Sequence, residues 1–298
     1  MNLIRFRTFA YIISLVLVGA SAVSLFAYGL KLGIDFTGGS ILEVEFASGR
    51  PDTSAVQEKV SSLGLGSIGV QPTGEKGLFL RTRDLSEEEH QRLLSALSPV
   101  GSAKELRFDS IGPTIGRELR SRAIWATLSV LVMIILYVAW AFRQVSRPVS
   151  SWMYGIFAVV ALFHDILIPA GLFAFLGKYY GVEIDTLFVT AILTVLGFSV
   201  HDTIVVFDRV RENLKKQVKG EKFEEVVSRS LDETIVRSIN TSLTVLVVLL
   251  ALYFLGSEST KYFSLALVVG IIAGTYSSIF IASSLLVTWN NWRQGAEA

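Results

Sequence analysis

The sequence predicts an α-helical membrane protein with six transmembrane helices and one small α+β domain outside the bilayer. Mean hydropathy is +0.54 over 298 residues, and charged residues make up only 18%, whereas ordinary soluble domains carry about 25%. The charge is also unevenly distributed, since 13 of the 26 acidic residues lie between Asp35 and Glu118. Long uncharged stretches around one acidic segment indicate membrane spans interrupted by a single water-soluble domain.

Six apolar segments are long enough to cross a bilayer, whose hydrocarbon core of ~30 Å needs about 20 helical residues. The segment that follows Arg5 and Arg7 resembles a signal peptide, but its apolar run is longer than the usual one. We therefore expect a retained helix there, with cleavage after an alanine as the alternative. The predicted spans are residues 9–30, 124–142, 151–176, 187–207, 238–255 and 262–288.

The Lys and Arg residues of the short connections predict the orientation, because these residues accumulate on the cytoplasmic side. With the N-terminus inside, the inner segments hold thirteen of them and the outer short loops hold two. We therefore expect both termini to be cytoplasmic. The inner thirteen are Arg5, Arg7, Arg143, Arg147, Arg293 and the eight bases from Arg209 to Arg237, and the outer two are Lys178 and Lys261.

The outer segment has the pattern of a small domain with the order β-α-β-β-α-β. Alternating residues predict strands, Gly64 ends the first helix, and Ser86 with Glu89 forms a capping box for the second. The order is that of the split βαβ, ferredoxin-like arrangement. The predicted strands are residues 41–46, 67–71, 77–82 and 104–109, and the predicted helices are residues 51–63 and 86–97.

The predicted parts follow from these assignments. The long inner connection is amphipathic and basic, so we expect a helix resting on the membrane surface there. In order, the parts are residues 1–30 with span one, 31–122 as the extracytoplasmic domain, 123–207 with spans two to four, 208–237 as a cytoplasmic amphipathic loop, and 238–298 with spans five and six and a short tail.

Several function classes are not supported by the composition. The chain has no cysteine, which excludes thiol catalysis and cysteine metal sites. A net charge of +1 without a basic and aromatic surface gives no indication of nucleic-acid binding. No phosphate-binding glycine-rich loop occurs, so the chain shows no ATPase of its own. We expect no enzyme activity, no cofactor and no metal.

Asp202 is the first candidate for chemistry, because it lies within the fourth predicted span. An ionisable group there costs ~2.5–3.5 kcal/mol on insertion scales and usually faces protein or water. Burial favours the neutral form of a carboxyl group, which suits it to pick up and release a proton. The alternative is that Asp202, near the inner end of the span, snorkels or caps.

Arg237 opens the fifth predicted span, at a depth similar to that of Asp202. A guanidinium group that approaches or leaves a carboxyl group would change its proton affinity. Asn240, Thr241 and Thr244 share a helix face with Arg237 and could hydrogen-bond Asp202. The alternative is a polar seam between packed helices, since Thr often bonds its own helix.

His164 and Asp165 lie in the middle of the third predicted span. Histidine titrates near neutrality, so the pair could relay protons, or it could tie this helix to a neighbour. His201 is adjacent to Asp202 but points about 100° away around the helix, so the two do not form a pair. Gly270 and Gly274 form a GxxxG pattern, which we interpret as close packing within the chain.

Four segments resemble the SecF family of the resistance-nodulation-division (RND) superfamily over essentially the whole chain. They are residues 33–40 (GIDFTGGS), the His164-Asp165 pair, residues 197–213 (GFSVHDTIVVFDRVREN) and residues 230–242 (SLDETIVRSINTS). The resemblance implies that Asp202 is the proton-handling aspartate of the family and Arg237 its arginine partner. The family often has Asn where His201 stands, so the role of His201 stays open.

The resemblance also implies the setting of the protein. Members of the family lie in the cytoplasmic (inner) membrane, form half of an RND-type bundle, and work with SecD beside the SecYEG channel. With the proton-motive force they pull an unfolded preprotein out of the membrane after SecA has pushed it. The expected partners are therefore SecD, SecYEG with SecA, the preprotein and lipid, and not nucleic acid.

Two other functions remain open from the residues. One is half of another RND-type transporter, for lipids or hydrophobic substrates. The other is a membrane scaffold, in which the buried charges only hold helices together.

Overall fold

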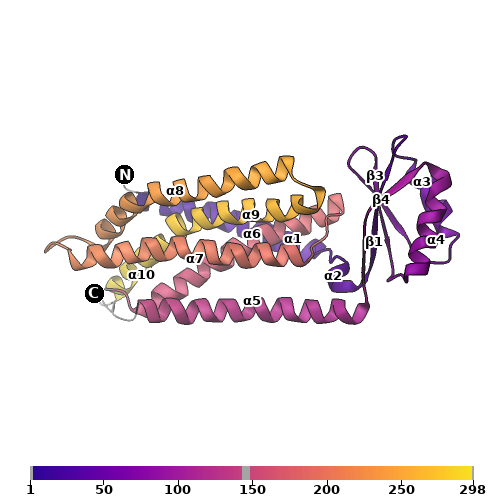
Figure 1. Cartoon of the computed structure of the whole chain (residues 1–298). Helices are drawn as coiled ribbons and strands as arrows, with labels where there is room; N and C mark the ends of the chain where they lie inside the picture. The colour runs from indigo at the N-terminus through magenta and orange to yellow at the C-terminus, as the bar shows by residue number, and fades with distance from the viewer. Residues whose placement is uncertain (1–2, 143–147, 297–298) are drawn as a thin grey trace. The chain divides into compact units, whose positions relative to one another are not determined.

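The computed structural model describes residues 3–142 and 148–296, and it divides into two compact units (Figure 1). Met1–Lys31 and Trp125–Ala298 form the first, which we call the membrane unit. Leu32–Ile124 forms the second, which we call the sheet domain. Arg143 and Arg147, counted in the charge bias, lie outside the described residues.

Among the described residues, six helices are long and apolar enough to cross a membrane, as the sequence predicts. The last of them is continuous from α9 through a short π-helical segment, η3, into α10. The helices are η1 (Leu3–Phe6) with α1 (Arg7–Tyr28), α5 (Pro113–Ala141), α6 (Ser151–Tyr180), α7 (Thr186–Lys215), α8 (Phe223–Leu255), and α9 (Glu258–Ser277) with η3 (Ser278–Ala282) and α10 (Ser283–Ala296).

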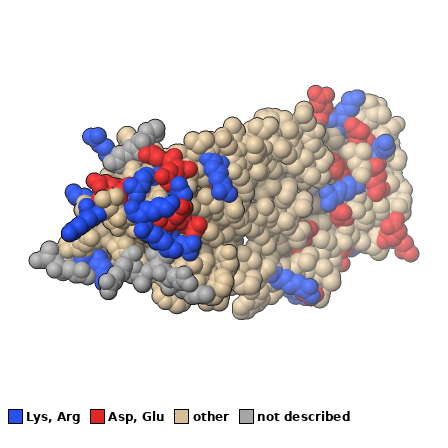
Figure 2. All heavy atoms as spheres, turned by 60° about the vertical axis from the view of Figure 1, so that its left-hand side comes forward, with Lys and Arg blue, Asp and Glu red and all other residues tan. Residues whose placement is uncertain are grey.

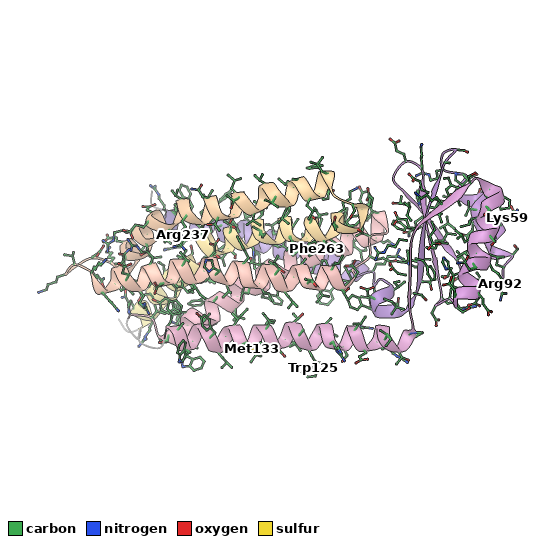
Figure 3. All side chains as sticks on the ribbon, in the orientation of Figure 1. Lys59, Arg92, Trp125, Met133, Arg237 and Phe263 are labelled. Atoms are coloured by element: carbon green, nitrogen blue, oxygen red, sulfur yellow. The ribbon has the colours of Figure 1, made fainter. Side chains whose placement is uncertain are left out.

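The six helices differ in how much of their surface the chain itself covers. In the most apolar part of the last span 67% of the residues are buried, and in α6 50%. The corresponding shares are 11% in α5 and 17% in α8. Trp125 and Met133, for example, are exposed on α5 (Figure 3). The last span and α6 therefore form the interior, while α5 and α8 offer their surfaces to lipid or to a partner.

The glycines of the last span allow close contact between α9 and α7. A Cβ atom built on Gly270 would lie 2.3 Å from Val195, and one built on Gly274 would lie 2.9 Å from Ser199. No larger residue fits at these positions without moving a helix, because contacts under 3 Å are repulsive. The GxxxG pattern thus packs within the chain, as expected.

The inner connection differs from the surface helix expected over residues 208–236. Helix α7 continues to Lys215 and α8 begins at Phe223, so most of this segment extends the two spans. Polar contacts between the helices explain the difference: Arg209 and Asn213 of α7 both bond the carboxylate of Glu233 on α8. Basic and acidic side chains gather at this end of the membrane unit (Figure 2), and several of them form ion pairs, such as those of Arg209 and Lys216 with Glu212.

The sheet domain has the predicted β-α-β-β-α-β order. The four strands are arranged β2-β3-β1-β4, with every neighbouring pair antiparallel. Since β3 lies between β1 and β2, the sheet is the split βαβ, ferredoxin-like arrangement. Helix α4 carries the predicted capping box of Ser86 and Glu89. The elements are β1 (Gly39–Phe46), α3 (Thr53–Ser61), β2 (Gly69–Thr73), β3 (Gly77–Thr82), α4 (Glu87–Leu97), η2 (Ser98–Val100) and β4 (Ala103–Ile111).

Two adjacent glycines lead the chain from a short helix, α2 (Ile34–Thr37), into the sheet. Gly38 and Gly39 have φ angles of +77° and +128°, which side chains rarely adopt. A Cβ atom on Gly38 would lie 2.7 Å from Cα of Pro113, and one on Gly39 would lie 2.7 Å from the carbonyl oxygen of Thr82. Both backbone conformation and space therefore require glycine here.

Candidate functional site

The carboxyl group of Asp202 is buried in the middle of the membrane unit. The residue is only 4% exposed, and its Oδ1 atom accepts a hydrogen bond of 3.3 Å from Ser238 Oγ of α8. Its Oδ2 atom is also buried but has no hydrogen-bond partner among the described residues. Buried polar atoms are nearly always hydrogen-bonded, so this carboxyl oxygen is unusual among the described residues.

The position of Asp202 follows from the periodicity of α7. Val195, Ser199, Asp202 and Val206 are all buried, and their spacing of three and four residues places them on one face of the helix. That face packs against α9 and α8, so the carboxyl group points into the protein. His201, by contrast, is exposed, in agreement with the expectation that the two residues do not pair.

Arg237 lies at the expected depth, but its side chain is exposed. Its neighbour Ser238 reaches the carboxyl group, whereas Arg237 is exposed on α8 (Figure 3). Among the described residues, no ion pair joins Arg237 to Asp202. Consecutive helical residues point about 100° apart, so only one of the two can face α7.

The three polar residues expected to assist Asp202 are also on the exposed side of α8. Thr241 Oγ1 donates to the carbonyl oxygen of Arg237, and Thr244 Oγ1 donates to that of Thr241. These hydroxyls thus bond their own helix, and within the described residues none of the three bonds Asp202. We call Arg237, Asn240, Thr241 and Thr244 together the α8 polar face.

His164 and Asp165 form a second buried polar group, on α6. Asp165 is completely buried, and its Oδ1 atom lies 2.9 Å from Nδ1 of His164. Its Oδ2 atom accepts hydrogen bonds from Ser199 Oγ of α7 at 2.5 Å and from Ser277 Oγ of α9 at 2.8 Å. Two helices therefore supply hydroxyl donors to this carboxyl group.

One face of α7 carries Asp202 and also reaches the carboxyl group of Asp165 on α6. Ser199, which bonds Asp165, precedes Asp202 by three residues on the same buried face. Three residues correspond to ~4.5 Å along a helix axis. Polar side chains of the third and fourth predicted spans thus lie in one region of the structure. Ser238 and Ser277 also belong to this region, and the sequence analysis missed these two serines. Serines at buried helix positions give only a weak sequence signal, because they also occur as ordinary packing residues.

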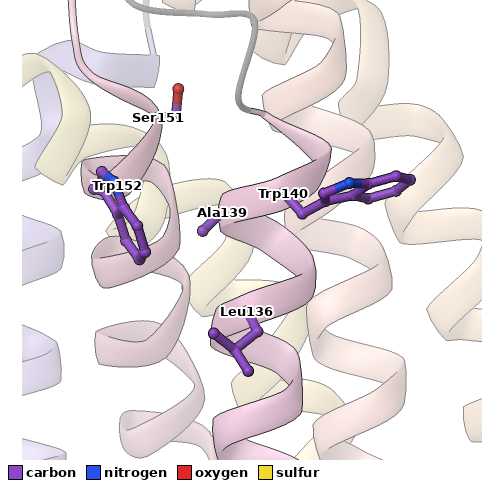
Figure 4. A pocket seen from close by; sticks show the side chains of 5 residues that line it. All are labelled: Leu136, Ala139, Trp140, Ser151 and Trp152. Carbon is purple, nitrogen blue, oxygen red and sulfur yellow. The ribbon is translucent and has the colours of Figure 1, made fainter.

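The described residues do not form a metal centre around these groups. The described residues contain no cluster of three or more His, Asp or Glu side chains placed to hold a metal ion. A pocket of about 340 Å³ lies between α5 and α6 (Figure 4), and none of its lining residues contacts Asp165 or Asp202. Its lining residues are Leu136, Ala139, Trp140, Ser151 and Trp152.

Two family models match the chain. Residues 92–292 match the model described as protein export membrane protein SecD/SecF, C-terminal, and residues 23–49 match the SecD/SecF GG motif. The second match contains the two glycines that require positive φ angles.

Curated relatives match over nearly their full length. Protein translocase subunit SecF of Thermobaculum terrenum is 46% identical over 97% of this chain and 94% of that protein. The subunit of the same name from Anaerolinea thermophila is 39% identical over 98% of this chain and 96% of that protein.

Solved structures of SecDF are similar in fold. SecDF from Thermus thermophilus, a translocon-associated membrane protein, matches with a TM-score of 0.85 and 33% identity, covering 98% of this chain. SecDF in a super-membrane-facing form matches with a TM-score of 0.71 and 34% identity, covering all of this chain. This chain spans only 39% and 40% of those two chains. The match confirms the predicted fold class, six helices of an RND-type bundle with a small α+β domain.

Proposed function

Because this chain belongs to the SecD/SecF family of protein export membrane proteins, we propose that it is the SecF-type subunit of a Sec protein translocase. It works with a SecD-type partner beside the SecYEG channel, after SecA has pushed the unfolded preprotein. It uses the proton-motive force to complete export across the cytoplasmic membrane. The observation that carries the ion-coupled part is the buried carboxyl group of Asp202, with one oxygen unpaired among the described residues.

The energy of proton movement is sufficient for such work. One proton crossing 100 mV releases ~2.3 kcal/mol, and each pH unit adds ~1.36 kcal/mol. Inverting a 1:99 population of two conformations needs ~5.5 kcal/mol. Two protons that cross 100 mV and one pH unit therefore supply enough energy to drive one change between two arrangements of the helices.

The α8 polar face supports the partnership with SecD. A guanidinium group facing lipid is costly, and α8 has few buried residues of its own. The Thermus thermophilus relative is named SecDF, and this chain matches about two fifths of it. Many transporters combine two structurally related halves, with the ion site at their interface. A second half covering α8 would bring Arg237 and its neighbours into a buried site next to Asp202.

We also propose the orientation that the charge bias predicts. Both termini and the α7–α8 connection face the cytoplasm, and the sheet domain faces the other side. The sheet domain then acts where the preprotein emerges. Half of another RND-type transporter remains the second candidate, although the SecF names of the full-length relatives favour export.

The substitution Asp202→Asn tests the ion-coupled role. The amide keeps the volume and can still accept the hydrogen bond from Ser238, but it cannot release a proton. In vesicles with the complete translocase, we expect normal expression, normal partner binding and normal ATP-driven translocation, with loss of the gradient-stimulated part. Asp208→Asn is the matched control, because Asp208 is exposed on the same helix and pairs with Arg211.

The control should export like the unmodified protein. A scaffold role predicts a different result, namely loss of folding or assembly in Asp202→Asn with no selective loss of gradient dependence. Gradient-stimulated export that persists at the normal rate in Asp202→Asn would refute the proposed proton handling.

A further inference from the structure

Polar side chains from three helices surround the carboxyl group of Asp165. It is completely buried and has three side-chain neighbours with donor capacity, His164, Ser199 and Ser277. Among the described residues, no Lys or Arg pairs with it. A buried carboxylate without a cation is costly, and gaining a proton removes that cost. A proton on either member of the His164–Asp165 pair would remove that cost.

His164 completes the charge balance of this site. Its Nδ1 atom faces the carboxyl group, and its Nε2 atom is buried without a partner among the described residues. Tyr276 of α9 stacks on the imidazole ring, and the Tyr276 hydroxyl accepts a hydrogen bond from Ser14 of α1. Since Lys and Arg are absent from these contacts, one proton shared by His164 and Asp165 makes the pair neutral, and its release leaves a charge of −1.

The π-helical segment places two consecutive serines on the inner side of the last span. Ser277 ends α9 and bonds Asp165, while Ser278 begins η3 and lies 2.8 Å from Oγ1 of Thr203. Consecutive residues of a regular α-helix point about 100° apart, and the wider π turn reduces that angle. Such segments are rare and frequently occur at functional sites.

Ser278 also bonds α7 on both sides of Asp202 in the sequence. Ser199 bonds Asp165, Ser278 donates to the carbonyl oxygen of Ser199 at 3.3 Å, and Ser278 also contacts Thr203. Thr203 follows Asp202 in the chain. These contacts hold η3 against α7.

We infer that the His164–Asp165 pair is a second proton-binding site, held by Ser199 of α7 and Ser277 of α9. This inference rests on the proposed function, to which it adds a second station for the same ion. Proton binding converts the Asp165 carboxylate to the carboxyl form, and release restores the carboxylate. The pair thus has a role beyond joining α6 to α7 and α9.

Infrared difference spectroscopy after a pH jump tests the inference directly. The sample is the full chain purified with its SecD-type partner in vesicles, and the probe is the C=O band of a protonated carboxyl group. We expect a titrating band that Asp165→Asn removes and Asp202→Asn retains. Ser277→Ala removes one hydrogen bond to the carboxyl group, so it should shift the frequency of this band.

Ser264→Ala is the matched control for Ser277→Ala. Ser264 is a completely buried serine on the same helix, and its hydroxyl donates to the carbonyl oxygen of Thr260. The control should leave the band and its midpoint unchanged. If Asp165→Asn does not fold, Ser277→Ala decides the question.

Two outcomes overturn the inference. One is a spectrum in which Asp165→Asn removes no titrating band. The other is a band whose frequency is the same in Ser277→Ala and in the unmodified protein. Export measurements distinguish these results from failure of the proposed function, since that function fails only if Asp202→Asn keeps gradient-stimulated export.

Discussion

Replacement of Arg237 by alanine should have opposite effects on the isolated chain and on the complex with a SecD-type partner. In the isolated chain the guanidinium group is exposed on α8, and no ion pair holds it among the described residues. A charged side chain at the centre of a bilayer costs ~2.5–3.5 kcal/mol on insertion scales. Arg237 begins an apolar stretch and can snorkel toward the interface, so we expect about half that cost.

Arg237→Ala should therefore stabilise the isolated chain by about 1–2 kcal/mol. In the complex, Arg237→Ala removes the side chain that we propose to interact with both Asp202 and the second half. Assembly or gradient-stimulated export should therefore decrease. Adding Asp202→Asn should then cost little more, because residues that act as one unit are not additive. Arg237→Lys should be only partly tolerated if the planar guanidinium group is required.

The assay is reversible unfolding of the purified chain in bicelles, compared with co-purification of the partner from the membrane. Arg229→Ala is the control, because Arg229 pairs with Glu221 within the chain at 2.5 Å. Its removal should cost about 1 kcal/mol or less, because the pair is partly exposed. If Arg237→Ala destabilised the isolated chain by 2 kcal/mol or more, Arg237 would have a partner within this chain and the reasoning would be wrong.

Three further predictions concern orientation, the sheet domain and helix packing. The chain has no cysteine, so a cysteine at Thr73 should react with an impermeant maleimide from outside and one at Lys219 should not; the reverse pattern would overturn the orientation. The hydrogen bond from Arg83 is the main cause, and the backbone amide of Ser86 the second, that lowers the pKa of Glu89 from near 4.5 to about 2. The Glu89 carboxylate therefore stabilises the fold above pH ~4.5, and this contribution disappears as the pH falls toward 2. Hydrogen exchange of α4 in the full chain should show a smaller acid-induced loss of protection in Arg83→Ala, and an unchanged pH dependence would contradict the assignment. Gly274→Val should destabilise the membrane unit by about 1–3 kcal/mol, because its Cβ atom would lie 2.9 Å from Ser199; normal unfolding of this variant would show that α9 and α7 can separate freely.

The sheet domain shows how much a local pattern can predict. Alternation in β1, the capping box of α4 and the turn between β2 and β3 all lie within a few residues along the chain, and each specifies its own element. Their order is sufficient to predict the ferredoxin-like arrangement. The observed strand bounds differ from the predicted ones by two residues or fewer. Strand ends depend on pairing across the sheet, which a local pattern does not contain.

The inner connection was predictable in composition but not in conformation. Its amphipathic pattern is compatible with a surface helix or with two packed helix ends. The choice depends on contacts between residues twenty or more positions apart, such as those of Arg209 and Asn213 with Glu233. Only the tertiary structure brings these side chains together.

By itself, the sequence determined the six spans, the sheet domain and the depth of the buried charges, because hydrophobic length and residue spacing act along a single helix. It identified Asp165 and Asp202 for the same reason, since an acidic residue in an apolar span is recognisable without its neighbours. The tertiary structure decided which hydroxyls reach those carboxyl groups. On α8 a rotation of about 100° between consecutive residues turns Ser238 inward and Arg237 outward, and only the packing of α8 against α7 and α9 sets that rotation.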